Sequence, residues 1–220
     1  MKSKIIVVST GHANTPIDLV ERCYNSIASQ GFTNVVTTMI IDKARIGKLA
    51  NFVNTIAGAK PEMDDIICDV DLDDYLLPGA FDVVMKAYCD NPDLLLTYGS
   101  YVTSSGKPAR FNGKYKTDSF RTQKWKASHL KSFKYKLYRQ IKLRDLKGSD
   151  GNFFMTTSDM ALMFSMMEMA GLDRIRHITE SLYCYNDESP LSDHNINADI
   201  QKRNEIYIRR QPRRQRIETF

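Results

Sequence analysis

The chain has 220 residues, 42% hydrophobic and 26% charged, which is typical of a globular protein with one sizeable core. No run of about 18 apolar residues occurs, so no membrane span is predicted. The net charge of +5 is unevenly divided, with −5 on residues 1–100 and +10 on residues 101–220. The acidic half fits a metal site and the basic half fits an anionic partner. Four scattered cysteines without a CxxC pair indicate reduced core residues and a cytoplasmic protein.

Strands and helices are predicted to alternate over the first 70 residues. The apolar spacing predicts strands at 5–9, 34–41 and 65–70 and helices at 17–30 and 46–59. This β-α-β-α-β order is typical of a doubly wound α/β fold, in which ligands bind beyond the carboxyl ends of the parallel strands. We therefore expect the loops at 10–15, 42–48 and 69–74 to meet in one crevice.

Four aspartates, Asp69, Asp71, Asp73 and Asp74, follow the third predicted strand within six positions. Carboxylates so close together repel one another unless a cation lies between them. Strand alternation would place Asp69, Asp71 and Asp73 on one side, where they could bind a hard cation such as Mg²⁺ or Mn²⁺. The alternative is a solvated acidic turn before a helix.

The middle of the chain is predicted to contain a helix at 81–89, strands at 94–98 and 100–102, and a polar loop at 104–123. Residues 124–147 then hold nine basic residues against one acid, interleaved with aromatic residues. One interpretation is an amphipathic helix with a core face of Leu130, Phe133, Leu137 and Ile141. The other is a surface for a phosphate-bearing acceptor, with aromatic rings that can stack on bases. The candidate acceptor residues are Trp125, Lys131 and Lys134.

A helix is predicted to start near Ser158, its candidate N-cap, and to end at Gly171. Its methionines are expected to fill the core, and Asp159 would lie in the first turn, where the helix dipole favours a carboxylate. A return strand is predicted at 175–186. The basic segment 201–220 is expected to form a helix or a partly disordered arm.

Three stretches of the first half resemble family 2 glycosyltransferases of the GT-A fold. They are SIASQGF at 26–32, GKLAN at 47–51 and DLDDYLLPG at 71–79, the last resembling the metal motif of that family. This sequence departs from the motifs of that family at two places. The acidic turn of the family is here Asp42-Lys43-Ala44-Arg45, and the Glu-Asp pair at the catalytic helix is here Ser158-Asp159.

The resemblance implies a single α/β domain of the GT-A type, with a Rossmann-like mixed sheet flanked by helices. Residues 1–100 would bind the sugar nucleotide, residues 101–200 would form the acceptor and catalytic half, and residues 201–220 would be a basic tail. It implies a metal-dependent, inverting transfer of a hexose, glucose by expectation, from a UDP-sugar. Asp159 would be the catalytic base. The expected donor contacts are Thr10, Asp42, Lys48, Asn51 and Asp71, and the expected Mn²⁺ or Mg²⁺ ligands are Asp71, Asp73 and His194.

The acceptor is expected from charge rather than from the resemblance. A half-chain of net charge +10 favours a polyanion, and a hydroxymethylated pyrimidine in DNA, of the kind that bacteriophages make, offers a hydroxyl. A soluble glycan or a protein hydroxyl is the alternative. An alternative of another class is a nucleic-acid-binding protein without activity, against which the four aspartates argue.

Overall fold

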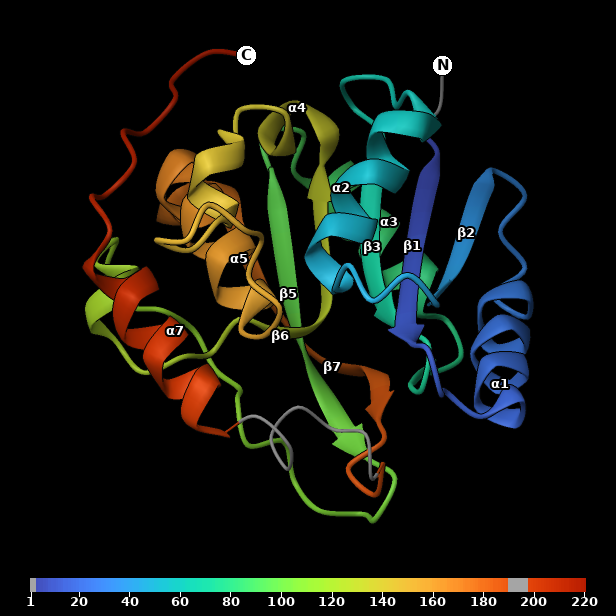
Figure 1. The fold of residues 1–220 in the computed structure, drawn as a ribbon. Coiled ribbons are helices and arrows are strands. Elements are labelled where there is room, and N and C mark those ends of the chain that lie inside the picture. The colour runs from blue at the N-terminus through green and yellow to red at the C-terminus, as the bar shows by residue number, and fades with distance from the viewer. Residues whose placement is uncertain (1–2, 190–197) are drawn as a thin grey trace.

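The computed structural model describes residues 3–189 and 198–220, and its centre is a mixed seven-stranded sheet (Figure 1). The strand order is β2-β1-β3-β6-β5-β7-β4. The strands are β1 (Ile5–His12), β2 (Val35–Asp42), β3 (Ile66–Asp71), β4 (Tyr75–Leu76), β5 (Leu96–Thr103), β6 (Ser128–Lys134) and β7 (Ile175–Tyr185). Both β2 and β3 run parallel to β1, whereas β6 is antiparallel to β3 and β5.

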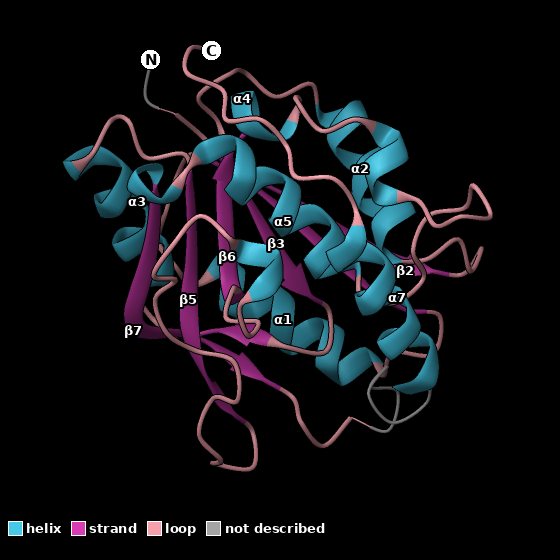
Figure 2. Ribbon diagram, turned by 90° about the vertical axis from the view of Figure 1, so that its left-hand side faces the viewer, coloured by secondary structure: helices cyan, strands magenta, loops and turns pink. Residues whose placement is uncertain are grey.

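Helices cover both faces of this sheet (Figure 2). The helices are α1 (Ile17–Ala28), α2 (Lys48–Ala59), α3 (Ala80–Asp90), α4 (Tyr135–Tyr138), α5 (Ser158–Ala170) and α7 (Ala198–Arg210), with 3-10 turns η1 (Phe120–Thr122), η2 (Leu143–Leu146) and η3 (Leu172–Arg174). One core cluster lies between the sheet and α1 and α3, and the other lies between the sheet and α2 and α5. None of the described helices is long and apolar enough to cross a membrane.

The predicted β-α-β-α-β order of the first half is confirmed, with boundaries shifted by a few residues. The strands β1, β2 and β3 end at His12, Asp42 and Asp71, on the same edge of the sheet. In the register of β1 and β3, Thr10 lies opposite Asp71. The three loops expected to form a crevice therefore leave the sheet at one edge.

The interpretation of residues 124–147 as an amphipathic helix is wrong. The centre of this segment is the strand β6, which lies between β3 and β5, and all seven of its residues are buried. This strand lies inside the sheet and helices cover both faces of the sheet, so its side chains are enclosed whatever their polarity. Only the four residues of α4 and the 3-10 turn η2 remain helical in this segment.

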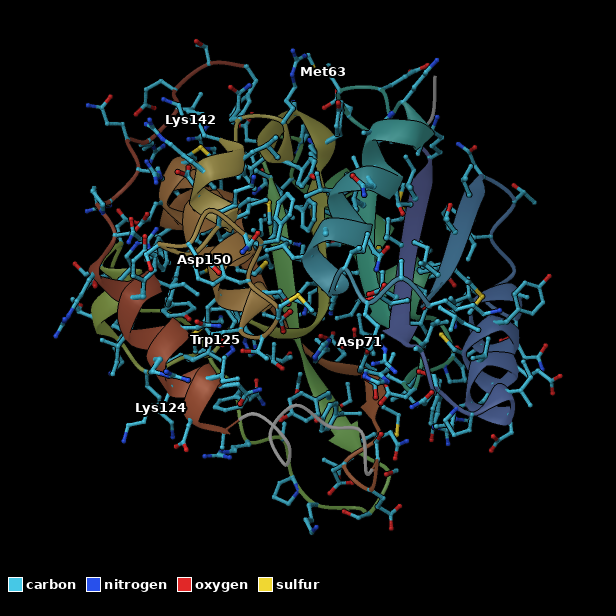
Figure 3. The ribbon with its side chains drawn as sticks, viewed as in Figure 1. Met63, Asp71, Lys124, Trp125, Lys142 and Asp150 are labelled. Atoms are coloured by element: carbon cyan, nitrogen blue, oxygen red, sulfur yellow. The ribbon has the colours of Figure 1, made fainter. Side chains whose placement is uncertain are left out.

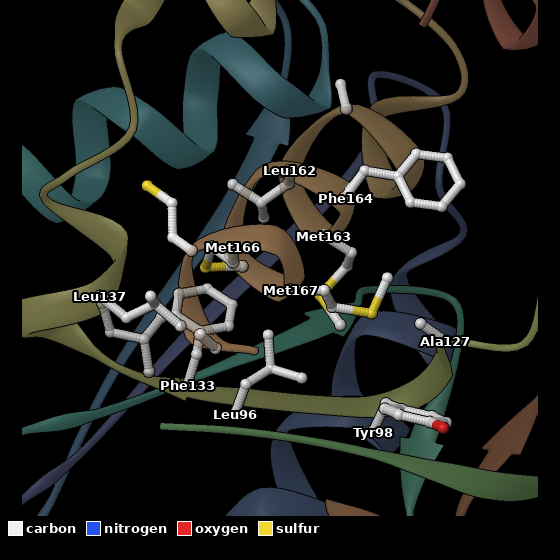
Figure 4. Packing of buried hydrophobic residues seen from close by; sticks show 14 of the residues in the cluster. Leu96, Tyr98, Ala127, Phe133, Leu137, Leu162, Met163, Phe164, Met166 and Met167 are labelled. Carbon is white, nitrogen blue, oxygen red and sulfur yellow. The ribbon is translucent and has the colours of Figure 1, made fainter. Parts of the chain in front are cut away.

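The helix α5 is more deeply buried than its predicted single apolar face requires. Every residue from Ala161 to Ala170 is buried, and Met163, Met166 and Met167 pack over Leu96 and Phe133 of the sheet (Figure 4). The helix ends at Gly171, as predicted. It begins one residue away from the predicted cap, because the N-cap is Thr157 in a left-handed conformation (φ 63°) and Ser158 is already helical.

The basic C-terminal segment is docked against the domain rather than free. After α7, the Ile217 N–H donates to the Met169 carbonyl at 2.9 Å, and Arg216 pairs with Asp173 at 2.6 and 2.9 Å. Arg214 likewise pairs with Asp145. Part of the positive charge of this segment is therefore engaged in internal ion pairs.

Candidate functional site

The loop between β2 and α2 brings a lysine to the acidic end of β3. Its geometry is fixed by Asp42, whose carboxylate accepts the N–H groups of Ile46 and Gly47 at 3.0 and 2.8 Å. Gly47 has φ 90°, and a Cβ there would lie 2.7 Å from the sulfur of Met155. Only glycine suits this turn without displacing its neighbours. Lys48 follows as the first residue of α2.

Two lysines and three carboxylates converge beside the carboxyl end of β3, the edge at which Figure 3 labels Asp71. The Lys48 Nζ lies 2.6 Å from Asp71 Oδ1, 3.2 Å from Asp69 Oδ2 and 3.7 Å from Asp159 Oδ1. From β6, the Lys131 Nζ lies 2.8 Å from Asp159 Oδ2 and 3.1 Å from Asp69 Oδ2. This network joins the acidic motif to the first turn of α5.

The electrostatics of this network differ between its carboxylates. Burial acts to raise the pKa of Asp159, but the charges of Lys131 and Lys48 outweigh it and hold the pKa well below its ordinary value. At Asp71 burial prevails, and with Asp69 nearby the pKa is raised despite Lys48. Asp159 is therefore an ionised carboxylate that needs no further cation, whereas Asp71 would gain from one.

The third and fourth aspartates of the motif lie in a turn. Because β3 ends at Asp71 and the Asp74 N–H bonds back to the Asp71 carbonyl at 3.1 Å, strand alternation does not extend to Asp73. The expectation that Asp73 shares a strand face with Asp69 and Asp71 is wrong in this respect. Asp74 points inward, where its carboxylate accepts the Tyr183 hydroxyl at 2.6 Å and the Asn186 N–H at 2.7 Å.

Among the described residues, one group of side chains has the spacing of a metal site. Oxygen atoms of Asp71 and Asp74 and a ring nitrogen of His129 lie within 4.8 Å of one another. Burial lowers the pKa of His129 to about 3, so its imidazole is neutral and can offer a lone pair. Its Nδ1 is buried without a hydrogen-bond partner in the described part of the chain. These donors fit a divalent cation.

Of the expected metal ligands, Asp71 belongs to this group. The Asp73 carboxylate does not, and His194 lies outside the described residues. Of the expected donor contacts, Lys48 and Asp71 meet directly, and Thr10 lies opposite Asp71 with its hydroxyl buried and unpartnered within the ranges described. Asn51 donates to the Gly47 carbonyl at 3.1 Å, so with Asp42 it braces the loop.

The three residues expected to contact an acceptor do not form one surface. Trp125 is 7% exposed and packs edge-on against Phe164, at 5.2 Å between ring centres. Lys134 donates to the Pro92 carbonyl at 2.6 Å and lies opposite Ile66, at the other end of β3 from Asp71. Lys131 is 1% exposed and belongs to the carboxylate network.

Sequence reasoning missed the roles of two β6 residues, His129 and Lys131. They occupy alternate positions of the segment Ser128–Lys134, so the period of a strand was present, but the abundance of basic residues pointed to a solvated face. Tyr183 was also missed, although its hydroxyl accepts the Asp71 N–H at 3.0 Å and donates to Asp74. No local motif marks it.

No family model and no curated protein matches this chain. Solved structures do match, among them three of S. aureus TarS residues 1–349, each 13% identical to this chain. The TM-scores are 0.56, 0.58 for the complex with UDP and 0.54 for the complex with UDP-GlcNAc. The matches cover 83%, 90% and 88% of this chain. The fold is of the GT-A glycosyltransferase type. The chain spans about three fifths of the TarS chains, covering 60%, 63% and 61% of them.

Proposed function

We propose that this protein is a glycosyltransferase that moves a hexose from a sugar nucleotide to a hydroxyl group. The observation that carries the proposal is the convergence of Asp69, Asp71 and Asp159 with Lys48 and Lys131 at the carboxyl ends of the parallel strands. Ligands of open α/β sheets bind at this edge. The fold is shared with structures of TarS in complex with UDP and UDP-GlcNAc, so the preferred donor is a UDP-sugar, with glucose as the first sugar to test.

The donor diphosphate would lie against Lys48 and the end of β3. Asp71, Asp74 and His129 would hold a divalent cation such as Mn²⁺ or Mg²⁺, with Asp73 and His194 as the further ligands proposed from sequence. Such a cation supplies a Lewis acid that neutralises the charge of the departing diphosphate. Lys48 adds a second positive charge from the protein itself.

Asp159 would act as the catalytic base. It stands in the first turn of α5 with one oxygen 2.8 Å from Lys131 and the other 3.7 Å from Lys48. A carboxylate held by two ammonium groups is a weak base. We therefore expect the donor diphosphate to draw Lys48 away from Asp159, since that contact is the longest of the three that Lys48 makes. Attack by the activated hydroxyl opposite the leaving group would invert the anomeric centre.

The favoured acceptor is a hydroxymethylated pyrimidine in DNA, with a soluble glycan or a protein hydroxyl as the alternative. The support is the net charge of +10 on residues 101–220, set against −5 on residues 1–100, which would bind the donor. The basic segment 201–220 contributes less to this than its composition implies, because Arg214 and Arg216 are paired internally.

The proposal is tested by donor turnover and transfer. Wild-type protein should hydrolyse UDP-glucose or another UDP-sugar with Mn²⁺ and transfer the sugar to DNA only when it carries hydroxymethylcytosine. Asp71→Asn and Asp73→Asn should each lose the divalent-dependent turnover, and EDTA should abolish it in the wild type. Turnover at the wild-type rate in EDTA would refute the metal assignment.

A thermal-shift screen distinguishes an enzyme from a non-catalytic nucleic-acid-binding protein. A UDP-sugar at a hundred times its dissociation constant should stabilise the protein by about 2.7 kcal/mol. A protein that binds DNA, shows no shift with any sugar nucleotide and turns none over would establish the non-catalytic alternative.

A further inference from the structure

The helix α7 presents a basic face to solvent. Its buried residue Ile208 packs into the core cluster that contains α5, and Figure 1 shows α7 on the outside of the domain beside α5. Because an α-helix has 3.6 residues per turn, positions 203, 206 and 210 lie on the side opposite Ile208, with position 202 at their edge. Lys202, Arg203 and Arg210 are exposed there and are termed the α7 basic face.

The cations of the α7 basic face have no partner of their own. In the part of the chain that the structure describes, their side chains make neither an ion pair nor a hydrogen bond. Arg209, on the flank of the helix, differs in this respect because it pairs with Glu205 at 2.8 Å. An acid, Asp199, lies on the exposed side in the first turn. Three cations against one acid leave a positive surface, which favours an anionic partner.

The loop beside α7 adds a further cation. The Arg209 guanidinium donates to the carbonyl groups of Arg121 and Gln123 at 2.6 and 3.0 Å, so the loop after η1 is held against α7. Lys124 follows Gln123 in this loop, and Figure 3 labels it beside α7. Its side chain is exposed and forms no ion pair with any described residue. The positive surface therefore continues from the helix onto the loop.

The first half of α7 is anchored next to the start of α5. The Thr157 hydroxyl donates to the Gln201 carbonyl at 3.3 Å, and the Asn204 side chain donates to the Thr156 carbonyl at 3.3 Å. Thr157 is the N-cap of α5, and Asp159, the proposed base, follows two residues later. The α7 basic face therefore begins beside the candidate active site and extends away from it along the helix.

The length of the α7 basic face suits a phosphate backbone. Lys202 and Arg210 are eight positions apart, which is roughly 12 Å along the helix axis. Each strand of duplex DNA carries one phosphate for about every 3.4 Å of the duplex axis. The face therefore spans about three phosphates of one strand. Lysine and arginine would donate charge-assisted hydrogen bonds to them.

We infer that the α7 basic face binds the phosphate backbone of a DNA duplex whose hydroxymethylated base lies at Asp159. The inference deepens the acceptor part of the proposed function and rests on it. An anionic membrane is the less suitable partner, because a helix that lies on a membrane inserts an apolar face. The apolar side of α7 is packed against the domain through Ile208, and its exposed side carries Ile206 among charged residues.

The test compares two triple variants that each remove three positive charges. The test variant combines Lys202→Gln, Arg203→Gln and Arg210→Gln. The control variant combines Lys60→Gln, Lys86→Gln and Lys142→Gln, at exposed positions in or next to α2, α3 and η2. Glutamine has nearly the same helix propensity as lysine and arginine, and all six side chains are exposed, so the melting temperatures of both variants should stay close to that of the wild type.

A fluorescein-labelled duplex of about 20 base pairs is titrated with each protein between low and physiological salt. At low salt the α7 variant should bind at least about tenfold more weakly than the wild type, and the control less than about threefold. The slope of log affinity against log salt should fall by about 0.9 for each phosphate contact removed, so by about 2.7 for three. Duplexes with and without hydroxymethylcytosine should bind alike, because phosphate contacts carry no sequence information.

Equal losses in the two variants, or no duplex binding by the wild type at low salt, would overturn the inference. Vesicles that contain phosphatidylserine provide a second probe. Vesicle binding that is lost in the α7 variant, with duplex binding unchanged, would also overturn it and assign the face to a membrane. Hydrolysis of a UDP-sugar by the wild type is measured on the same preparation. Hydrolysis without duplex binding would reject this inference alone, whereas duplex binding through α7 without hydrolysis would support it and count against the proposed enzyme.

Discussion

Replacement of Lys131 by methionine probes the carboxylate network most directly. The Lys131 side chain is 1% exposed and pairs with Asp69, itself 2% exposed, at 3.1 Å and with Asp159 at 2.8 Å. Methionine has a side chain of similar length but no charge. Lys48, which lies 3.2 Å from Asp69 and 3.7 Å from Asp159, would then be the one lysine of this network left to pair with both carboxylates. Removal of one partner from a buried ion pair typically costs about 3–5 kcal/mol, so we expect a loss of this size in the free energy of unfolding.

Lys136→Met is the matched control. Lys136 pairs with Asp64 at 2.8 Å, but that carboxylate is 61% exposed, and ion pairs at the surface contribute about 0–1 kcal/mol. Both variants and the wild type are unfolded in urea near neutral pH, with a common slope expected because the fold is retained. A third protein, Lys131→Met with Asp159→Asn, should recover part of the loss, since one unpaired charge is gone. Equal costs for Lys131→Met and Lys136→Met, or no recovery, would refute the network.

Three further changes test other parts of the molecule. Asp159→Asn should leave the thermal shift caused by a UDP-sugar nearly unchanged and lower the transfer rate by about 10²- to 10⁴-fold. Weaker donor binding with unchanged turnover would show that Asp159 is not the base. Arg121→Met should lower the free energy of unfolding in urea by about 3–5 kcal/mol, because it removes the ion-pair partner of the buried Glu168 carboxylate, which lies 2.7 Å from Arg121. A decrease below about 1 kcal/mol would contradict this. Gly11→Ala should destabilise the protein by about 1–3 kcal/mol, because the added Cβ would lie 2.6 Å from Leu72. Gly58→Ala is the control and should not destabilise, because a Cβ there would have nothing within 4 Å. Equal thermal stabilities of the two variants would contradict this prediction.

The fold of the first half could be predicted from local patterns alone. Apolar runs with the period of strands and helices recur there in a regular order, and both β2 and β3 pair with β1, so periodicity and turn residues suffice. Part of the candidate site could also be predicted from the sequence. Asp71 is the last residue of β3 and Lys48 follows the loop after β2, and the α/β order places both of these positions at the same edge of the sheet. The position of Asp159 in the first turn of α5 was predicted in the same way.

Tertiary structure decided the part of the site that β6 supplies. Lys131 meets Asp69 across antiparallel strands that lie far apart in the chain, and a sequence does not show which distant carboxylate will neutralise a lysine. A run of basic residues looks solvated as long as its partners are unknown, and the same holds for Arg214, which Asp145 neutralises. The acidic turn shows the converse limit, since the end of β3 at Asp71 turned Asp74 rather than Asp73 inward to Tyr183. Sequence periodicity determines which residues share a strand face, but only the packed sheet determines where each strand ends and which charges it encloses.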